Sequence, residues 1–156
     1  MTGCVVAIYT SGSAQAPMRA VDEAFVEAGK GLAGDRYYRR NGRVSDELER
    51  TRDSEITLIE SEEITRFNET EGLDLGLGAL RRNIVTRGIG LNTLVDRRFR
   101  VGEVWLEGIR LCEPCAHLAK LVTPRVLPGL VHRAGLRACI VAGGTIRTGD
   151  AVIVES

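Results

Sequence analysis

The residues with the clearest chemical potential are two cysteines, Cys112 and Cys115, in the segment Leu111-Cys-Glu-Pro-Cys-Ala-His-Leu-Ala-Lys-Leu121. Pro114 suits the first turn of a helix, because its missing N–H needs no partner there. Cys115 is then expected at or beside a helix N-terminus, where the helix dipole and free N–H groups favour a thiolate. Such a thiol could act as a nucleophile or carry sulfur. It could equally be a packing residue, since cysteine is among the most buried residue types.

Other uses of these thiols fit the sequence less well. A structural zinc site needs four ligands in paired clusters, and no second CxxC or HxxxH pattern exists to add to His117, His132 or Cys139. We therefore expect no structural metal. Ala116 separates Cys115 from the following histidine and so breaks the CxxCH haem motif. A thioredoxin-like role needs a βαβ context that is not predicted, and no spacing requires a histidine base for a cysteine hydrolase.

The composition is that of a soluble globular protein and predicts one domain, residues 1–156. Hydrophobic residues make up 44% and charged residues 27% of the 156 residues. The formal net charge is +0, so no global field attracts nucleic acid or a membrane surface. No apolar run is long enough to span a bilayer, and the first residues lack the basic region of a secretory signal. We expect a cytoplasmic protein whose four cysteines are free thiols.

The hydrophobic pattern predicts a mainly β fold. Strands are expected within residues 3–9, 55–60, 81–87, 101–106, 137–142 and 151–154. Residues 18–28 fit either a strand or a short helix, and we favour a strand. A helix is expected from Glu62 to about Glu71, capped by Ser61 and ended at Gly72, with a second helix after Cys115. About seven strands with few helices favour a closed β-barrel with a few short helices, because closure removes exposed strand edges.

Two polar segments are candidates for ligand binding. In Lys30-Gly-Leu-Ala-Gly-Asp-Arg-Tyr-Tyr38, two glycines before Asp-Arg describe a tight turn that a ligand could approach closely. Residues 35–53 hold six arginines and five acids, which suits a solvated loop with internal ion pairs or an anion-binding lid. The second segment, Arg81-Arg-Asn83, enters a predicted strand and would either face a site or lie on the surface.

Five blocks in order give the chain a resemblance to a known family. They are Lys30-Gly-Leu-Ala-Gly-Asp-Arg-Tyr, Leu80-Arg-Arg-Asn-Ile-Val-Thr-Arg-Gly-Ile, Val101-Gly-Glu-Val-Trp-Leu-Glu, Cys112-Glu-Pro-Cys115 and Gly144-Thr-Ile-Arg-Thr-Gly-Asp-Ala-Val. Together they resemble the MOSC domain, the C-terminal module of molybdenum-cofactor sulfurases, which also occurs as small free-standing proteins. The resemblance extends over nearly the whole chain from about Gly31.

The resemblance implies a β-barrel that binds molybdenum cofactor (molybdopterin) or a related anionic ligand and carries sulfur on a cysteine for building metal–sulfur centres. It implies Cys115 as the sulfur-bearing residue and Cys112 as a neighbour able to resolve it. A cysteine desulfurase or a molybdoenzyme would be the partner, and the chain would act as a sulfur carrier or transferase. The alternative is a non-catalytic module that binds molybdenum cofactor or another oxyanion. The expected cofactor-binding residues are Lys30, Gly31, Gly34, Asp35, Arg36, Arg81, Arg82 and Asn83.

Overall fold

The computed structural model describes residues 2–13, 15–38 and 55–154. Its elements, in chain order, are β1 (Thr2–Thr10), β2 (Arg19–Val21), β3 (Glu23–Glu27), β4 (Gly31–Leu32), β5 (Ile56–Glu60), α1 (Ser61–Glu71), β6 (Ile84–Arg87), the 3-10 helix η3 (Leu91–Leu94), β7 (Arg98–Val101), β8 (Val104–Leu111), α2 (Ala116–Leu121), α3 (Val126–Gly129), β9 (Leu136–Ala142), β10 (Gly144–Arg147) and β11 (Ala151–Ile153).

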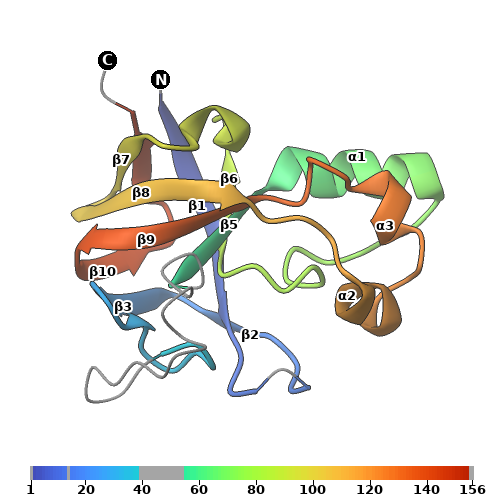
Figure 1. The fold of residues 1–156 in the computed structure, drawn as a ribbon, viewed down its shortest axis with the longest axis horizontal. Helices are drawn as coiled ribbons and strands as arrows, with labels where there is room; N and C mark the ends of the chain where they lie inside the picture. The colour runs from blue at the N-terminus through green and yellow to red at the C-terminus, as the bar shows by residue number, and fades with distance from the viewer. Residues whose placement is uncertain (1, 14, 39–54, 155–156) are drawn as a thin grey trace.

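Among the described residues, seven strands form a closed barrel in the order β11-β7-β8-β9-β5-β6-β1, and β1 pairs with β11 to close the ring. The β5–β6 pair is parallel, while the other neighbouring pairs of the ring are antiparallel. β2 extends the sheet beyond β1, and β10, β3 and β4 form a smaller sheet. Figure 1 shows the barrel on one side of the molecule and α1, α2 and α3 together on the other. The predicted closed β-barrel with short helices is confirmed.

Two apolar clusters hold the barrel and the helical side together. Along β8, buried residues alternate with more exposed ones from Val104 to Gly108, as expected for a strand with one face in a core. β5 is buried throughout Ile56–Ile59 because its two faces meet different cores. Leu58 belongs to the barrel core, whereas Ile59 packs in the second cluster with the helical side.

The first helix ends where the sequence predicts but begins slightly earlier. α1 starts at Ser61, its N-cap is Glu60, and no side chain caps it, so the predicted capping role of Ser61 is wrong. Gly72 ends the helix with φ 66°, a left-handed conformation that glycine adopts without strain. Ile64 and Phe67 are its buried residues and join the second apolar cluster.

Several boundaries differ from the expectation. Residues 18–28 form two short strands, β2 and β3, which supports the strand interpretation. The strand expected at 81–87 begins only at Ile84, and Arg81 has φ 65° in the preceding loop. β9 matches the strand expected at 137–142, whereas β7 and β10 are strands that the sequence pattern did not predict. Most of the segment considered as an anion-binding lid lies outside the described residues. No helix in the described ranges is long and apolar enough to cross a membrane.

Candidate functional site

The two cysteines of the CxxC segment lie in different environments. Cys115 is the N-cap of α2 and is exposed, and its carbonyl oxygen accepts a hydrogen bond from the Ala119 N–H at 3.0 Å. The expected position beside a helix start is therefore confirmed, but Pro114 precedes the N-cap instead of lying in the first turn. Cys112 is 1% exposed. Of the pair, only Cys115 presents its thiol to solvent.

The loop that carries these cysteines is fastened to a buried arginine. The Nε of Arg82 donates to the Ala134 carbonyl at 2.9 Å, and Nη1 donates to the Leu80 carbonyl at 3.1 Å. Nη2 donates to the carbonyls of Cys112 at 3.2 Å and Glu113 at 3.5 Å. Every nitrogen of the guanidinium group therefore has a backbone acceptor, and the side chain connects three separate segments of the chain.

The electrostatic surroundings of Arg82 are unusual for an arginine. Burial lowers the pKa of Arg82 because a low-dielectric environment disfavours its charge, and the positive charge of Arg137 lowers it further. Cys112, Cys115 and Tyr37 act in the opposite direction, since their ionised forms would attract the guanidinium. The backbone contacts contain no carboxylate, so Arg82 remains a buried cation beside two thiols.

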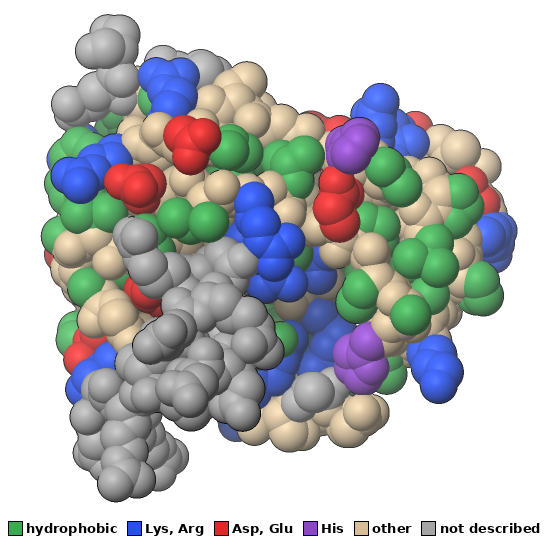
Figure 2. All heavy atoms as spheres, in the orientation of Figure 1, with side chains coloured by type: hydrophobic (Ala, Val, Ile, Leu, Met, Phe, Trp, Pro, Cys, Tyr) green, Lys and Arg blue, Asp and Glu red, His purple; other side chains and the backbone are tan. Residues whose placement is uncertain are grey.

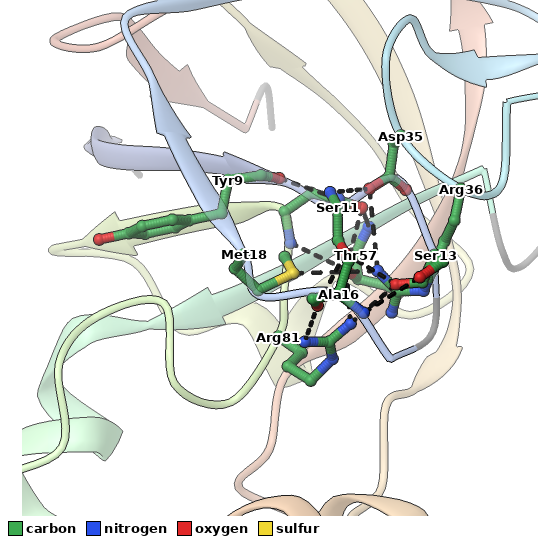
Figure 3. Close-up of polar contacts among 10 residues, drawn as sticks. Tyr9, Ser11, Ser13, Ala16, Met18, Asp35, Arg36, Thr57 and Arg81 are labelled. Carbon is green, nitrogen blue, oxygen red and sulfur yellow. Dashed lines mark hydrogen bonds and ion pairs between the residues drawn. The ribbon is translucent and has the colours of Figure 1, made fainter.

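The neighbouring Arg81 makes its hydrogen bonds elsewhere, with the loop that follows β1. The guanidinium donates to the Ala16 carbonyl at 2.8 Å, to the Ser13 carbonyl at 3.2 Å and to the Ser11 hydroxyl at 3.4 Å. Figure 3 shows Arg81 and Arg36 approaching this loop from different elements. Burial lowers the pKa of Arg81, and repulsion from the guanidinium of Arg36 lowers it further.

Arg36 lies beside Arg81 and has its own set of contacts. Its guanidinium carbon lies 4.6 Å from the ring centroid of Tyr37, within the range of a cation–π contact. Nη1 lies 3.8 Å from Oδ1 of Asp35 and 3.9 Å from the sulfur of Met18. Nε of Arg36 is buried and has no hydrogen-bond partner among residues 2–13, 15–38 and 55–154. One buried donor of this side chain is therefore available to an added acceptor.

Asp35 positions the turn that carries Arg36. Its Oδ1 accepts the Ser11 N–H at 2.9 Å, while the N–H of Arg36 donates to the Ser11 carbonyl at 2.7 Å. Asp35 is 6% exposed, and its Oδ2 is buried without a hydrogen-bond partner in the described part of the chain. The turn of Asp35 and Arg36 is thus held against the end of β1.

The glycines and the lysine of the same block have separate roles. Gly31 has φ 107°, and a Cβ there would meet the Glu55 carbonyl oxygen at 3.0 Å, so close strand packing explains this glycine. Gly34 has φ 89° with open space around it. Lys30 pairs with Glu27 at 3.5 Å. None of these contacts joins the Cys115 loop.

Asn83 ties strands of the barrel together. Its Oδ1 accepts from both the N–H and the hydroxyl of Thr57, each at 3.1 Å, and its Nδ2 donates to the Tyr9 carbonyl at 3.1 Å. The Asn83 N–H also donates to the Thr57 hydroxyl at 3.0 Å. Asn83 is 2% exposed. These contacts assign it to the connection of β1 with β5 and leave its amide without an open face for a ligand.

Arg36, Arg81, Arg82 and Arg137 together form what we name the arginine cluster. Tyr37 acts electrostatically on both Arg81 and Arg82, which places the two groups around the same region. Figure 2 shows Lys and Arg side chains gathered in a hollow between the barrel and the helical side. Tyr37 lies in the predicted ligand segment but was not named as a site residue, and no sequence pattern indicated Arg137. Arg137 lies in the interior of β9 opposite Thr57 and Arg110, and only the strand register brings it near Arg82.

A second hollow is lined by none of the residues of the arginine cluster. It has a volume of about 470 Å³ and is lined by Glu63, Asn92, Val131, His132 and Arg133. His132 contacts the loop through the Glu113 carboxylate. The His132 N–H donates to Oε1 at 2.7 Å, and the ring Nδ1 lies 2.5 Å from Oε2. No group of three or more His, Cys, Asp or Glu side chains in the described ranges could hold a metal ion.

The carboxyl group of Glu60, close to Glu63 of this second hollow, makes the free energy of unfolding depend on pH. Burial, with repulsion from Glu63 and Glu62, raises the pKa of Glu60 from 4.5 to about 6. The stabilising contribution of the neutral form is complete below pH 4.5 and is lost as the pH rises through about 6.

We therefore expect Glu60→Gln to be more stable than the wild type above pH 6. The gain should be about 1 kcal/mol, because Glu60 is only half-buried and solvent screens its charge. Urea unfolding of both proteins at about pH 4 and about pH 7.5 measures this difference. Equal differences at the two pH values would contradict the role assigned to Glu60.

Comparison with known proteins identifies the family. The family model of the MOSC domain matches residues 45–153, so the chain belongs to the MOSC domain family. Its structure is similar to that of the YuaD protein from Bacillus subtilis, with a TM-score of 0.82 and 16% identity, over 97% of this chain and 94% of that chain. It is also similar to YiiM from Geobacillus stearothermophilus, with a TM-score of 0.69 and 16% identity, over 99% of this chain and 75% of that one.

A third similar structure is YiiM from Escherichia coli, with a TM-score of 0.69 and 16% identity, over 98% of this chain and 70% of that chain. The search of curated protein sequences gave no match. At this level of identity the structural likeness establishes the shared fold, and the arginine cluster and Cys115 must support any statement about activity.

Proposed function

We propose that this protein binds molybdenum cofactor, or a related anionic ligand, at the arginine cluster and carries sulfur on Cys115. The observation that carries the proposal is an exposed thiol in a loop fastened to a buried, cationic Arg82, with further guanidinium groups around it. Positive charge near a thiol favours an anionic sulfur, either a thiolate or a persulfide. The same charges attract the phosphate of a pterin cofactor.

The residues present fit an anionic group. In the described part of the chain, Nε of Arg36 and Nε of Arg137 are buried and have no hydrogen-bond partner. Unpaired buried donors are costly, so an added acceptor would be favourable. Arg36 and Arg137 would hold the ligand by charge-assisted hydrogen bonds, and Tyr37 would border it. When bound, the cofactor would supply a metal centre that accepts sulfur.

The chemical step on the chain's own residues is a sulfur exchange. The Cys115 thiolate attacks the outer sulfur of a protein persulfide on a cysteine desulfurase. A new sulfur–sulfur bond forms on Cys115, the donor's sulfur–sulfur bond breaks, and the donor leaves as a thiolate, so no oxidant is needed. Cys112 could resolve the persulfide only after the loop opens, because it is 1% exposed.

Sulfur loading tests this proposal. The protein is incubated with a cysteine desulfurase and cysteine, and the intact mass is followed. We expect the wild type and Cys4→Ser to gain one sulfur atom, and Cys115→Ser to gain none. Cys4 is a suitable control because it is a free, partly exposed thiol on β1. An unlabelled wild type, or equal labelling of Cys115→Ser, would disprove the carrier role.

The unpaired Nε of Arg36 also supports a second candidate, a module that binds the ligand without covalent chemistry. In that case Cys115→Ala leaves the affinity for molybdopterin unchanged. In both cases Arg36→Leu should weaken binding by about 1.5–3 kcal/mol, the range for a hydrogen bond to a charged group.

Titration calorimetry with molybdopterin released from a purified molybdoenzyme measures these affinities. Arg125→Leu is the matched control, because its guanidinium donates to the Glu71 carbonyl at 2.9 Å near α3, outside the arginine cluster. Binding that is weakened equally by Arg125→Leu and Arg36→Leu would reject the arginine cluster as the ligand site.

A further inference from the structure

We infer that Arg82 is a positioning residue for Cys115: its guanidinium fastens the Cys112–Cys115 loop from inside and sets the thiol at the rim of the arginine cluster. The inference rests on the proposed reactivity of Cys115. It replaces the role that the sequence suggested for Arg82, which was direct contact with the ligand.

The hydrogen bonds of Arg82 carry this inference. Its three nitrogens donate to the carbonyls of Ala134, Leu80 and Cys112 at 2.9, 3.1 and 3.2 Å. Arg82 is largely buried, with 9% of the residue exposed. A guanidinium whose nitrogens all have backbone acceptors has little capacity left to hold a ligand. Its geometric effect is instead to join the loop, the 80–82 segment and the turn before β9.

The loop is also held from the side of that turn. The Cys112 N–H donates to the Gly135 carbonyl at 2.8 Å, and the Glu113 carboxylate accepts the His132 N–H at 2.7 Å. The first two residues of the loop are therefore fixed by backbone and side chain together. Two positions further on, Cys115 is exposed. The exposed thiol of Cys115 therefore follows directly on a segment that hydrogen bonds hold in place.

A plain structural link does not require a charge at this position. A buried cation without a carboxylate partner is costly, and apolar side chains can often replace buried ionic groups without loss of stability. The charge of Arg82 does have a use near Cys115, because an anionic sulfur and a guanidinium attract each other. Arg82 thus combines two effects: its planar guanidinium group donates hydrogen bonds to several carbonyls at once, and its positive charge lies near the thiol.

Variants can separate these two effects. In a Cys4→Ser background, Cys115 is the accessible thiol among the described cysteines, since Cys112 and Cys139 are 1% and 2% exposed. Arg82→Lys keeps the positive charge but loses the planar guanidinium group with its several donors, and Arg82→Met loses both the charge and the donors. Arg125→Met is the matched control, because it removes a guanidinium–carbonyl bond elsewhere.

Two measurements follow each variant, after circular dichroism has shown that it is folded. Amide hydrogen exchange reports the loop, and alkylation of Cys115 is timed with anionic iodoacetate and with neutral iodoacetamide. Arg82→Lys and Arg82→Met should both raise exchange over residues 111–116 by about tenfold or more. The ratio of iodoacetate to iodoacetamide rates should fall several-fold in Arg82→Met and stay near the wild-type ratio in Arg82→Lys. A general loss of structure would not produce this difference between the reagents.

The inference is overturned if a folded Arg82→Lys variant shows wild-type exchange over residues 111–116, and this variant decides the matter when Arg82→Met does not fold. It is also overturned if Arg82→Met leaves the loop and both alkylation rates unchanged but weakens molybdopterin binding. These measurements need no sulfur donor, so a failure of sulfur loading would affect the proposed function alone.

Discussion

Replacing Gly135 by alanine is expected to destabilise the protein by about 4 kcal/mol or more, which is in the exceptional range for one substitution. Gly135 has φ 110°, a conformation that L residues rarely adopt. A Cβ there would also collide with the carbonyl oxygen of Leu58, which is main chain in β5 and cannot rotate away. Both causes act on the wall of the barrel, so urea unfolding should show the full loss.

The matched control is Gly34→Ala. Gly34 also has a positive φ, 89°, but a Cβ added there would meet nothing within 4 Å. It should lose about 1–2 kcal/mol from the backbone conformation alone. The Cys112 N–H donates to the Gly135 carbonyl, so any Gly135→Ala protein that folds should also have a loosened cysteine loop. If Gly135→Ala lowers the free energy of unfolding no more than Gly34→Ala does, the Leu58 carbonyl must be able to move away from the added Cβ.

Asn83→Ala is expected to cost about 3–5 kcal/mol. The substitution removes the acceptor of the Thr57 N–H and the donor to the Tyr9 carbonyl, and both groups lie in the barrel wall. Each buried polar group left without a partner costs about 1–3 kcal/mol, and a small cavity adds to the loss.

Urea unfolding again measures the loss, with Asn92→Ala as the control. The Asn92 amide donates one exposed hydrogen bond, to the His132 carbonyl at 2.8 Å, and its removal should cost about 1 kcal/mol or less. If Asn83→Ala instead keeps its stability and loses molybdopterin binding, the amide would be a ligand contact as the sequence suggested. Equal stability of the two variants would also contradict the assigned role.

The sequence predicted the barrel and the position of Cys115 because both depend on local patterns. Alternating apolar residues and glycine turns indicate strands, and a proline beside a cysteine indicates a helix start nearby. Neither requires knowledge of which distant segments meet. The additional strand β10 was missed because its four residues, Gly144–Arg147, contain one buried apolar residue and resemble a turn.

The roles of Arg81, Arg82 and Asn83 could not be read from their order. The three residues are consecutive, yet they contact the loop after β1, the cysteine loop and β5 respectively. Arg81 adopts φ 65° in the loop before β6, so the alternation of side chains along a strand does not apply to it. Arg137 was missed for a related reason, since an arginine within a strand gives no local sign of the residues that will lie across the sheet.

The pairing of β1 with β11 has a practical consequence for work with this protein. Thr2 is opposite Ile153 in that pair, so the two ends of the described chain leave the barrel as neighbours. Figure 1 shows both ends on the side of the barrel remote from α2. An affinity tag or a fused enzyme joined to either end would therefore emerge far from the thiol, and desulfurase fusions can be built without blocking it.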